Sequence, residues 1–355
     1  MPGSAEEFGS LGAGDLVDAG DPGWSRFVAA HPDATCFHQP AWLATLSRAY
    51  GFRALVAVQR DPAGTVVAGL PLVEVRRPTG TRRWSCLPFS DECGPLVAPG
   101  GSAAALLSRT EALGRARGVA ELEVRTAVEF SGARSRQVAV THALTLASEA
   151  GAGQRPLPFR GSVRRHIATA RRTGVQVRAA EVVDEVVGTY YRLHVETRRR
   201  QGVPAQPRDY FRVLWDQVLE PGGGFVLIAR HGGAAVAGAV YLVGGRTVTY
   251  KYGASDSRAW SLRPNHAVMA EAIAWATERQ YTTFDLGRTD LDNPGLVQFK
   301  ESWGAVTRPL CYTSSSGRVG YRAGSAAHGL LASLIRRSPA TVCRGLGELL
   351  YRYAA

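Results

Sequence analysis

The sequence predicts an α/β (α+β) protein with two similar domains in tandem, each a mixed sheet flanked by helices, followed by two C-terminal amphipathic helices. The length of 355 residues corresponds to two domains at roughly 150 residues per domain. The order of strand, turn, strand and helix occurs twice. An apolar strand, a turn and Val-Ala-Gly stand at residues 55–69 and again at 226–238, offset by 171 and then 169 residues. These observations together indicate a duplicated α/β unit.

The first half is predicted from apolar spacing and turn residues. Apolar residues at helical intervals predict two helices before the first strand. Asp61-Pro62-Ala63-Gly64 is a turn between two apolar runs and predicts a hairpin, and Gly118 is a typical helix stop. The predicted elements are helices 24–30 and 41–50, strands 54–59, 66–75 and 82–87, a helix 103–117, and strands 122–124 and 142–146.

The second half repeats this order. Gly232-Gly233 separates two apolar runs in the manner of a hairpin turn. A long helical pattern opens at Pro264, a residue favoured at the first position of a helix. The predicted elements are strands 225–229, 236–243 and 247–252, a helix 264–278, a strand 282–286, a short helix 291–303 and a strand 310–313.

These elements set the predicted domain boundaries. Residues 1–22 lack periodicity and are predicted to form a disordered lead, followed by domains at 23–155 and 156–315. Residues 316–355 form a helical tail interrupted at Ser338-Pro339. Its apolar faces pack on the body of the protein or lie on an anionic membrane surface. The residues of these two faces are Leu330, Leu331, Leu334 and Ile335, then Leu346, Leu349, Leu350 and Tyr353.

Composition limits the class of protein. The formal net charge of +12 predicts a polyanionic partner, which is a nucleic acid, a phosphate-rich substrate or an anionic membrane surface. No run approaches the roughly 18 apolar residues of a membrane span, and the acidic N-terminus does not resemble a secretory signal, so a cytoplasmic protein is expected. Five scattered cysteines without a CxxC pair argue against disulfides and zinc, and the scattered histidines argue against any metal site.

The basic residues are almost all arginine. Of the 42 basic residues only Lys251 and Lys300 are lysine, and both lie in segments rich in aromatic residues and glycine. A retained lysine indicates a position that requires a compact ammonium rather than a planar guanidinium. The two lysines are therefore candidate functional residues.

Two arginine runs lie near the predicted domain junction. Positions 164, 171 and 172 fall on roughly one helical face, and a second run follows at 198–200. The runs are either a solvated surface or a groove for phosphates, and their closeness in sequence favours the groove. The candidate phosphate-binding residues are Arg164, Arg165, Arg171, Arg172, Arg198, Arg199 and Arg200.

Common catalytic signatures are missing from the sequence. There is no GxSxG, HExxH, Walker loop or dinucleotide-binding GxGxxG. Enzymes that have no metal, no redox cofactor and no obvious nucleophile usually work by holding two substrates in position and by stabilising the charge that develops in the reaction. Group transfer between bound substrates fits that description.

Five short segments then carry a resemblance to a known family. They are Phe-His-Gln-Pro-Ala-Trp at 37–42, Leu-Pro-Phe-Ser-Asp at 87–91, Thr-Tyr-Lys-Tyr-Gly-Ala-Ser-Asp at 249–256, Phe-Asp-Leu-Gly-Arg at 284–288 and Gln-Phe-Lys-Glu-Ser-Trp-Gly-Ala at 298–305. Their order resembles the Fem family of aminoacyl-tRNA-dependent transferases and GNAT-like proteins with a FemAB-type domain. The resemblance implies two tandem GNAT-like domains. Two departures are the lack of a long helical-hairpin insertion and of the GNAT pyrophosphate loop, where residues 262–266 stand instead.

The resemblance also implies roles for individual residues. Lys300 matches the lysine of the family's Phe-Lys motif and is expected to hold the terminal phosphate of tRNA or to stabilise a tetrahedral oxyanion. Asp285 and Asp91 are the candidate bases for the attacking amine. Strand alternation predicts that Tyr250 and Tyr252 both face opposite to Lys251. The candidate substrate-binding residues are Phe299, Tyr250, Tyr252, Lys251, Arg288 and Asn265.

The expected function is an aminoacyltransferase that moves an amino acid from charged tRNA to an amine on a peptidoglycan precursor or a small natural product. No cofactor is expected beyond the aminoacyl-tRNA donor. An acyltransferase that uses acetyl-CoA and a non-catalytic binding protein remain the alternatives. The expected partners are charged tRNA, an amine-bearing acceptor and, through the tail, a membrane surface.

Overall fold

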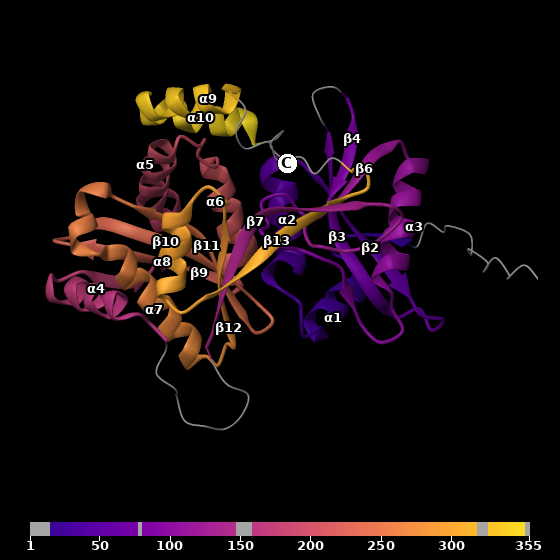
Figure 1. Cartoon of the computed structure of the whole chain (residues 1–355), viewed down its shortest axis with the longest axis horizontal. Helices are drawn as coiled ribbons and strands as arrows, with labels where there is room; N and C mark the ends of the chain where they lie inside the picture. The colour runs from indigo at the N-terminus through magenta and orange to yellow at the C-terminus, as the bar shows by residue number, and fades with distance from the viewer. Residues whose placement is uncertain (1–14, 77–79, 147–157, 318–325, 352–355) are drawn as a thin grey trace, which may run out of the picture.

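The computed structural model describes residues 15–76, 80–146, 158–317 and 326–351. One continuous sheet runs through both halves of the chain in the order β1-β2-β3-β4-β6-β13-β7-β12-β11-β10-β9-β8, with β5 paired to β3 outside this path (Figure 1). The strands are β1 (Leu16–Asp18), β2 (Arg53–Arg60), β3 (Val66–Arg76), β4 (Arg82–Ser85), β5 (Leu96–Val97), β6 (Val119–Val124), β7 (Arg134–Thr145), β8 (Gln176–Ala179), β9 (Gly224–His231), β10 (Ala234–Gly244), β11 (Thr247–Ser255), β12 (Thr283–Thr289) and β13 (Val306–Ser314).

Helices lie on the faces of this sheet. The first half contributes α1, η2, α2 and α3, and the second half contributes the remaining helices, of which α9 and α10 form the tail and pack on α5. The helical elements are α1 (Pro22–Ala30), η2 (Cys36–His38), α2 (Pro40–Tyr50), α3 (Ala103–Ala116), α4 (Gly161–Arg172), η3 (Glu185–Tyr190), α5 (Tyr191–Gln201), α6 (Arg208–Leu214), η4 (Trp215–Leu219), η5 (Ser257–Leu262), α7 (Pro264–Glu278), α8 (Pro294–Ser302), α9 (Ala326–Arg337) and α10 (Ala340–Leu350). The predicted elements are confirmed with shifts of a few residues at their ends, except that the strand predicted at 142–146 begins eight residues earlier, at Arg134.

The two halves share one topology. Antiparallel strands β1 to β4 correspond to β8 to β11, and each set is followed by a parallel partner, β6 beside β4 and β12 beside β11. A parallel pair needs a crossover connection, which α3 and α7 supply. The predicted tandem duplication is confirmed at the level of strand order.

The Val-Ala-Gly repeat has a packing reason. A Cβ atom on Gly69 of β3 would lie 2.5 Å from Cζ3 of Trp24 in α1, and one on Gly238 of β10 would lie 3.1 Å from Cδ2 of Tyr190 in η3. Each half therefore lays an aromatic ring from the helix that follows its first strand directly on a hairpin strand. The glycine leaves room for that ring.

The boundary predicted between residues 155 and 156 does not divide the sheet, because each half gives its last strand to the other. Strand β7 belongs to the first half in sequence but pairs with β12, while β13 of the second half pairs with β6. Strands β7 and β13 also pair with each other along residues 134–143 and 306–314. Because β7 and β13 pair with each other, a single sheet extends across both halves.

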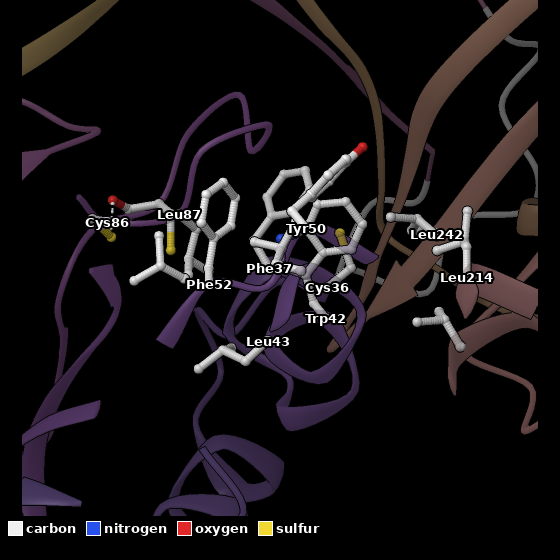
Figure 2. Packing of buried hydrophobic residues seen from close by; sticks show 14 of the residues in the cluster. Cys36, Phe37, Trp42, Leu43, Tyr50, Phe52, Cys86, Leu87, Leu214 and Leu242 are labelled. Atoms are coloured by element: carbon white, nitrogen blue, oxygen red, sulfur yellow. Dashed lines mark hydrogen bonds between the residues drawn. The ribbon is translucent and has the colours of Figure 1, made fainter. Parts of the chain in front are cut away.

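The two faces of the second-half sheet carry separate cores. Val226, Ile228 and Val240 pack in a cluster with α5 and α6, whereas the alternate residues Leu227 and Ala239 pack in a cluster with α4 and α7. The first cluster continues into the first half, where Figure 2 shows Phe37 and Trp42 beside Leu214 and Leu242. This shared core buries the junction between the halves.

The prediction for the N-terminal end of the chain needs correction. Residues 15–22 are not a disordered lead, because β1 pairs with β2 and Asp15 accepts hydrogen bonds from Arg109 at 2.9 and 3.0 Å. The rest of the predicted lead lies outside the described residues.

The tail helices form as predicted, but their apolar faces are divided. Ile335 is buried and Leu331 and Leu346 pack against the core, while Leu330 and Leu349 are 73% and 66% exposed. Tyr353 lies outside the described residues. Across residues 15–76, 80–146, 158–317 and 326–351, no helix has both the length and the apolar character needed to cross a membrane.

Candidate functional site

Four charged side chains meet where strands from the two halves come together. Asp91 follows β4 in the first half, whereas Lys251, Asp285 and Lys300 lie on β11, β12 and α8 of the second half. Lys251 Nζ lies 3.8 Å from Asp91 Oδ1, and the charges of both Asp91 and Asp285 act on Lys300. The three candidate catalytic residues and the second lysine are therefore brought together from positions 209 residues apart in sequence, counted from 91 to 300.

A glycine bulge in β12 forms the floor of this cluster. The pairing of β12 with β7 shifts register between Asp285 and Gly287, and Gly287 has φ of +71°. A Cβ atom on Gly287 would lie 2.9 Å from Asp91 Oδ2, so the close approach requires glycine. The bulge directs the carbonyls of Gly287 and Arg288 toward Lys300, and the Arg288 N–H donates to Asp91 Oδ2 at 3.4 Å.

Lys300 is buried at the end of α8. The helix begins at Pro294 behind an Asn293 side chain that accepts from the Leu296 N–H at 3.1 Å. Lys300 is 3% exposed, and its ammonium donates to the Gly287 and Arg288 carbonyls at 2.8 Å each. An ammonium has three donors, so one remains for a ligand. Burial lowers the pKa of Lys300 to about 8, against the opposing charges of Asp91, Asp285 and Asp290.

The two carboxylates differ in their surroundings. Asp285 accepts a hydrogen bond from the Gly287 N–H at 2.8 Å. Burial and the charge of Asp91 raise the pKa of Asp285 to about 6, while the Gly287 bond and Lys300 oppose the rise. The Asp91 side chain is 22% exposed and lies at the open side of the cluster. The pair offers one carboxylate that titrates near neutral pH and one that faces solvent.

Lys251 lies in an aromatic cage. Its ammonium sits 5.2 Å from the Phe37 ring centroid, 5.7 Å from that of Trp42 and 5.1 Å from that of Tyr252. It also donates a short hydrogen bond to the Phe89 carbonyl. Burial lowers the pKa of Lys251, but Asp91, Tyr252 and Cys36 raise it more, so the net direction is upward.

The predicted orientation of Tyr250 and Tyr252 is wrong. Strand β10 pairs Val240 with Tyr252 and Tyr241 with Tyr250, so Lys251 is the extra residue of a bulge. The two tyrosines therefore occupy opposite faces. Tyr250 packs against Tyr241 at 5.7 Å, while Tyr252 lies beside Lys251 and its hydroxyl is 3.0 Å from that of Tyr210.

Phe299 and Arg288 lie at the edges of the cluster. Phe299 is half-buried and packs edge-on against His266 at 5.5 Å and Trp303 at 6.3 Å. The Arg288 guanidinium pairs with Asp290 at 2.7 Å and donates to the Tyr312 hydroxyl at 3.4 Å.

Asn265 braces a loop. Its side chain donates to Ser255 Oγ at 3.3 Å, and the same oxygen accepts from the Trp260 indole at 3.0 Å. The connection from β11 to α7 contains the 3₁₀ helix η5, then Arg263 with φ of +58°, then Pro264 at the first position of α7. Proline has no N–H, and the N–H of His266 already donates to the Arg263 carbonyl at 3.0 Å. This connection offers few free amides for a pyrophosphate.

The two arginine runs do not form one groove, which corrects the sequence prediction. Helix α4 packs on α7 and helix α5 packs on β11, so the runs lie on opposite faces of the sheet. Arg164, Arg171 and Arg172 line a groove of about 650 Å³ between α4 and α7, with an apolar floor that includes Phe159 and Ile273. Arg165 is exposed on the same helix.

The second run lies near the charged cluster. Arg198 sits 5.8 Å from the ring of Tyr252, the same ring that contacts Lys251. Arg200 lies 5.0 Å from the Trp260 ring and donates to the Ser255 carbonyl at 3.3 Å. Arg199, which lies between them in sequence, is half-buried.

Sequence reasoning missed two residues of this region. Arg125 donates to the Ser90 carbonyl at 2.7 Å, and the Tyr312 hydroxyl donates to the Asp91 carbonyl at 3.0 Å. Arg125 directly follows a predicted strand, a position that could have marked it. Nothing in the spacing of Tyr312 marks it. In the described part of the chain, no group of three or more His, Cys, Asp and Glu residues is arranged to hold a metal ion.

Comparisons with known proteins bear on this site. A family model described as an acetyltransferase (GNAT) domain matches residues 158–301, a range that contains Lys251, Asp285 and Lys300. Lipid II:glycine glycyltransferases from Staphylococcus haemolyticus and Staphylococcus epidermidis are 36% identical over 86 and 78 residues. These matches cover 22% and 20% of this chain, which spans about a fifth of the length of these curated relatives.

Three solved structures resemble the whole fold. FemX has a TM-score of 0.64 at 17% identity and covers 82% of this chain and 94% of its own. The L-PGS structure from Bacillus licheniformis scores 0.54 at 14% identity, with 90% and 98% covered. A tandem GNAT protein from the clavulanic acid biosynthesis pathway scores 0.50 at 16% identity, with 86% and 98% covered. The predicted fold class and the resemblance to the Fem family are confirmed.

Proposed function

Because the chain is Fem-like and carries a GNAT domain, we propose that it is an acyltransferase that moves an amino acid from charged tRNA to an amine acceptor, with formation of an amide bond. The observation that carries the proposal is that Lys300 is buried beside Asp91 and Asp285. Its ammonium donates two hydrogen bonds to backbone carbonyls, and its third N–H remains for a ligand. The acceptor is an amine on a peptidoglycan precursor or a small natural product.

The chemistry follows from the two carboxylates and the lysine. The acceptor ammonium lies between Asp91 and Asp285, and Asp285 takes its proton, since a base with a pKa near 6 is close to neutral pH. The free amine attacks the ester carbonyl carbon, a C–N bond forms, and the carbonyl electron pair moves to oxygen. The remaining donor of Lys300 stabilises that oxyanion. Collapse breaks the C–O bond, and the ribose oxygen leaves with the proton held by Asp285. The attacking nitrogen then gives its extra proton to the freed Asp285 carboxylate, which passes it to solvent, so a neutral amide remains.

Phosphates of the donor need cationic partners outside the cluster. We place the end of the tRNA on the run Arg198 to Arg200, because Arg198 and Lys251 share the ring of Tyr252. The α4 arginines lie on the other face and would contact a more distant part of the same polyanion. The half-buried ring of Phe299 is the proposed platform for a terminal base.

Acyl-CoA is the second candidate donor. The description of the matching family model favours it. The connection from β11 to α7 opposes it, because η5 and Pro264 stand where a pyrophosphate would need free backbone amides.

The first experiment compares the two donors on the full chain. Thermal unfolding is measured with charged tRNA, uncharged tRNA and acetyl-CoA at fixed salt, and amide products are followed by mass spectrometry. A donor at 100 times its dissociation constant stabilises by about 2.7 kcal/mol. Stabilisation and turnover with charged tRNA alone support the proposal, whereas stabilisation and turnover with acetyl-CoA alone overturn it in favour of the second candidate.

The matched variant is Lys300→Met. It keeps a side chain of similar length but removes the ammonium, so turnover should fall by about 100-fold or more. Binding of the donor should persist. Turnover that is unchanged in this variant would contradict the role of Lys300, and binding without any amide product in the wild type would indicate a non-catalytic binding protein.

A further inference from the structure

The segment that carries Asp91 has a strained backbone. Leu87 and Phe89 have φ of +50° and +65°, in the left-handed region that bulky residues avoid. Phe89 cannot adopt this conformation cheaply as an isolated residue, so the surrounding structure must hold it. The carboxylate of Asp91, two residues further on, depends on the same backbone.

Side-chain donors hold four carbonyls of this segment. The Leu87 carbonyl accepts from Ser90 Oγ at 2.8 Å, and the Ser90 carbonyl accepts from Arg125 Nη1 at 2.7 Å. The Phe89 carbonyl accepts from Lys251 Nζ, and the Asp91 carbonyl accepts from Tyr312 Oη at 3.0 Å. Lys251 and Tyr312 belong to the second half of the chain, whereas the segment belongs to the first.

The cage around Lys251 fixes where its ammonium lies. The side chain is 4% exposed and is enclosed by the rings of Phe37, Trp42 and Tyr252. A compact ammonium fits between three rings, while a planar guanidinium is broader. Within this cage the ammonium reaches both the Phe89 carbonyl and Asp91 Oδ1, at 3.8 Å for the latter.

We propose that Lys251 is a positioning residue that holds the strained segment Leu87–Asp91 and thereby places the Asp91 carboxylate against Gly287 and Arg288. Lys251 acts through Asp91 and not on the substrate itself, since its ammonium donates to the Phe89 carbonyl and lies 3.8 Å from Asp91 Oδ1. The kinetic part of this proposal rests on the proposed function. The structural part, that Lys251 holds the segment Leu87–Asp91, does not depend on that function.

Hydrogen exchange tests the proposal without any substrate. In Lys251→Met, backbone amides in a peptide spanning residues 87–93 should exchange about tenfold faster than in the wild type, while the β2–β3 hairpin keeps its protection. The matched control is Arg279→Met, which removes a cation–π contact of 4.4 Å with Trp275 remote from the segment. Unchanged exchange at 87–93 in a folded Lys251→Met protein overturns the proposal.

Tyr312→Phe provides a second variant that keeps the ring and removes only the hydroxyl. It should also raise exchange at 87–93, because the Asp91 carbonyl loses its donor. If Lys251→Met does not fold, this variant decides whether donors from the second half hold the segment. Unchanged exchange in Tyr312→Phe would then overturn the proposal.

A double-mutant cycle separates positioning from general stability. Lys251→Met should lower kcat/KM on the order of tenfold, but the Lys251→Met/Asp91→Asn double variant should be no slower than Asp91→Asn alone. Additive losses would mean that Lys251 acts independently of Asp91 and would overturn the positioning role. If the wild type makes no amide product with any donor, the proposed function fails while the exchange result still decides the structural claim.

Discussion

The two lysines of the chain have opposite electrostatic environments although they serve one site. Burial dominates at Lys300 and lowers its pKa to about 8, so its proton is exchangeable near neutral pH. At Lys251 the nearby Asp91 and Tyr252 outweigh burial and keep the ammonium charged. In the proposed mechanism the same residue type thus supplies an oxyanion donor in one place and a fixed cation in the other.

The pH dependence of activity should be bell-shaped. Asp285 must be deprotonated to accept a proton, so kcat/KM should rise with pH through about 6. Lys300 must be protonated to donate, so activity should fall as pH rises through about 8. A pH profile of the wild type measures both limbs. An acid limb near pH 6 that persists in Asp285→Asn would show that another group is the base.

Gly287→Ala should remove activity by displacing Asp91. The new Cβ would lie 2.9 Å from Asp91 Oδ2 and the residue has φ of +71°. Gly64→Ala is the matched control, because Gly64 has φ of +83° with nothing within 4 Å of the new atom. Both variants should lose about 1–2 kcal/mol of unfolding free energy from the backbone conformation.

Only Gly287→Ala should lose more than about tenfold in turnover, since a misplaced carboxylate no longer orients the amine. Urea unfolding gives the stability of both variants, and initial rates give their activity. Equal activity in the two variants would contradict the role of the bulge.

At the scale of elements, each half depends on a ring seated on a hairpin glycine. Gly69→Ala places a Cβ 2.5 Å from the Trp24 ring and should destabilise the protein by about 1–3 kcal/mol through overpacking. Gly188→Ala is the control, because no atom lies within 4 Å of its new Cβ. Thermal unfolding distinguishes the two, and an equal Tm shift would contradict the packing explanation.

The tail helices carry both buried and exposed aliphatic side chains. Ile335 is buried, so Ile335→Ala should cost about 2–5 kcal/mol, while Leu334, at 57% exposed, should change stability by less than about 0.5 kcal/mol on the same substitution. Urea unfolding checks both values. Equal losses would mean that the tail does not dock as described.

The exposed leucines allow a test of the expected membrane contact. Leu330, Leu334 and Leu349 face outward beside the exposed Arg336 and Arg337. We expect co-sedimentation with anionic vesicles that is reduced in a Leu330→Ser/Leu334→Ser variant and absent with zwitterionic vesicles. Equal sedimentation of the variant would assign any membrane contact to another surface.

At the scale of the whole molecule, the exchange of β7 and β13 makes the two halves one folding unit. Neither half completes its sheet without a strand from the other, and the larger core crosses the junction. Calorimetry of the full chain should therefore show one transition with equal calorimetric and van't Hoff enthalpies. Two resolved transitions would mean that the halves unfold independently.

The sequence by itself determined the local elements and the duplication, and it singled out the two lysines as candidates. Hydrophobic periodicity and turn residues encode helices and strands over a few residues, and the Val-Ala-Gly repeat records packing that recurs in each half. Lys251 and Lys300 were marked by composition alone, because a rare lysine stands out against 40 arginines.

Only the tertiary structure decided how these parts meet. The strand exchange, the separation of the arginine runs and the support of Asp91 by Arg125 and Tyr312 depend on contacts between distant residues, which local patterns do not encode. A single bulged residue at Lys251 turned Tyr250 and Tyr252 to opposite faces, because side chains alternate with a period of two and one inserted residue reverses every later position. The site is therefore a product of long-range pairing, while its chemical groups are visible in the sequence.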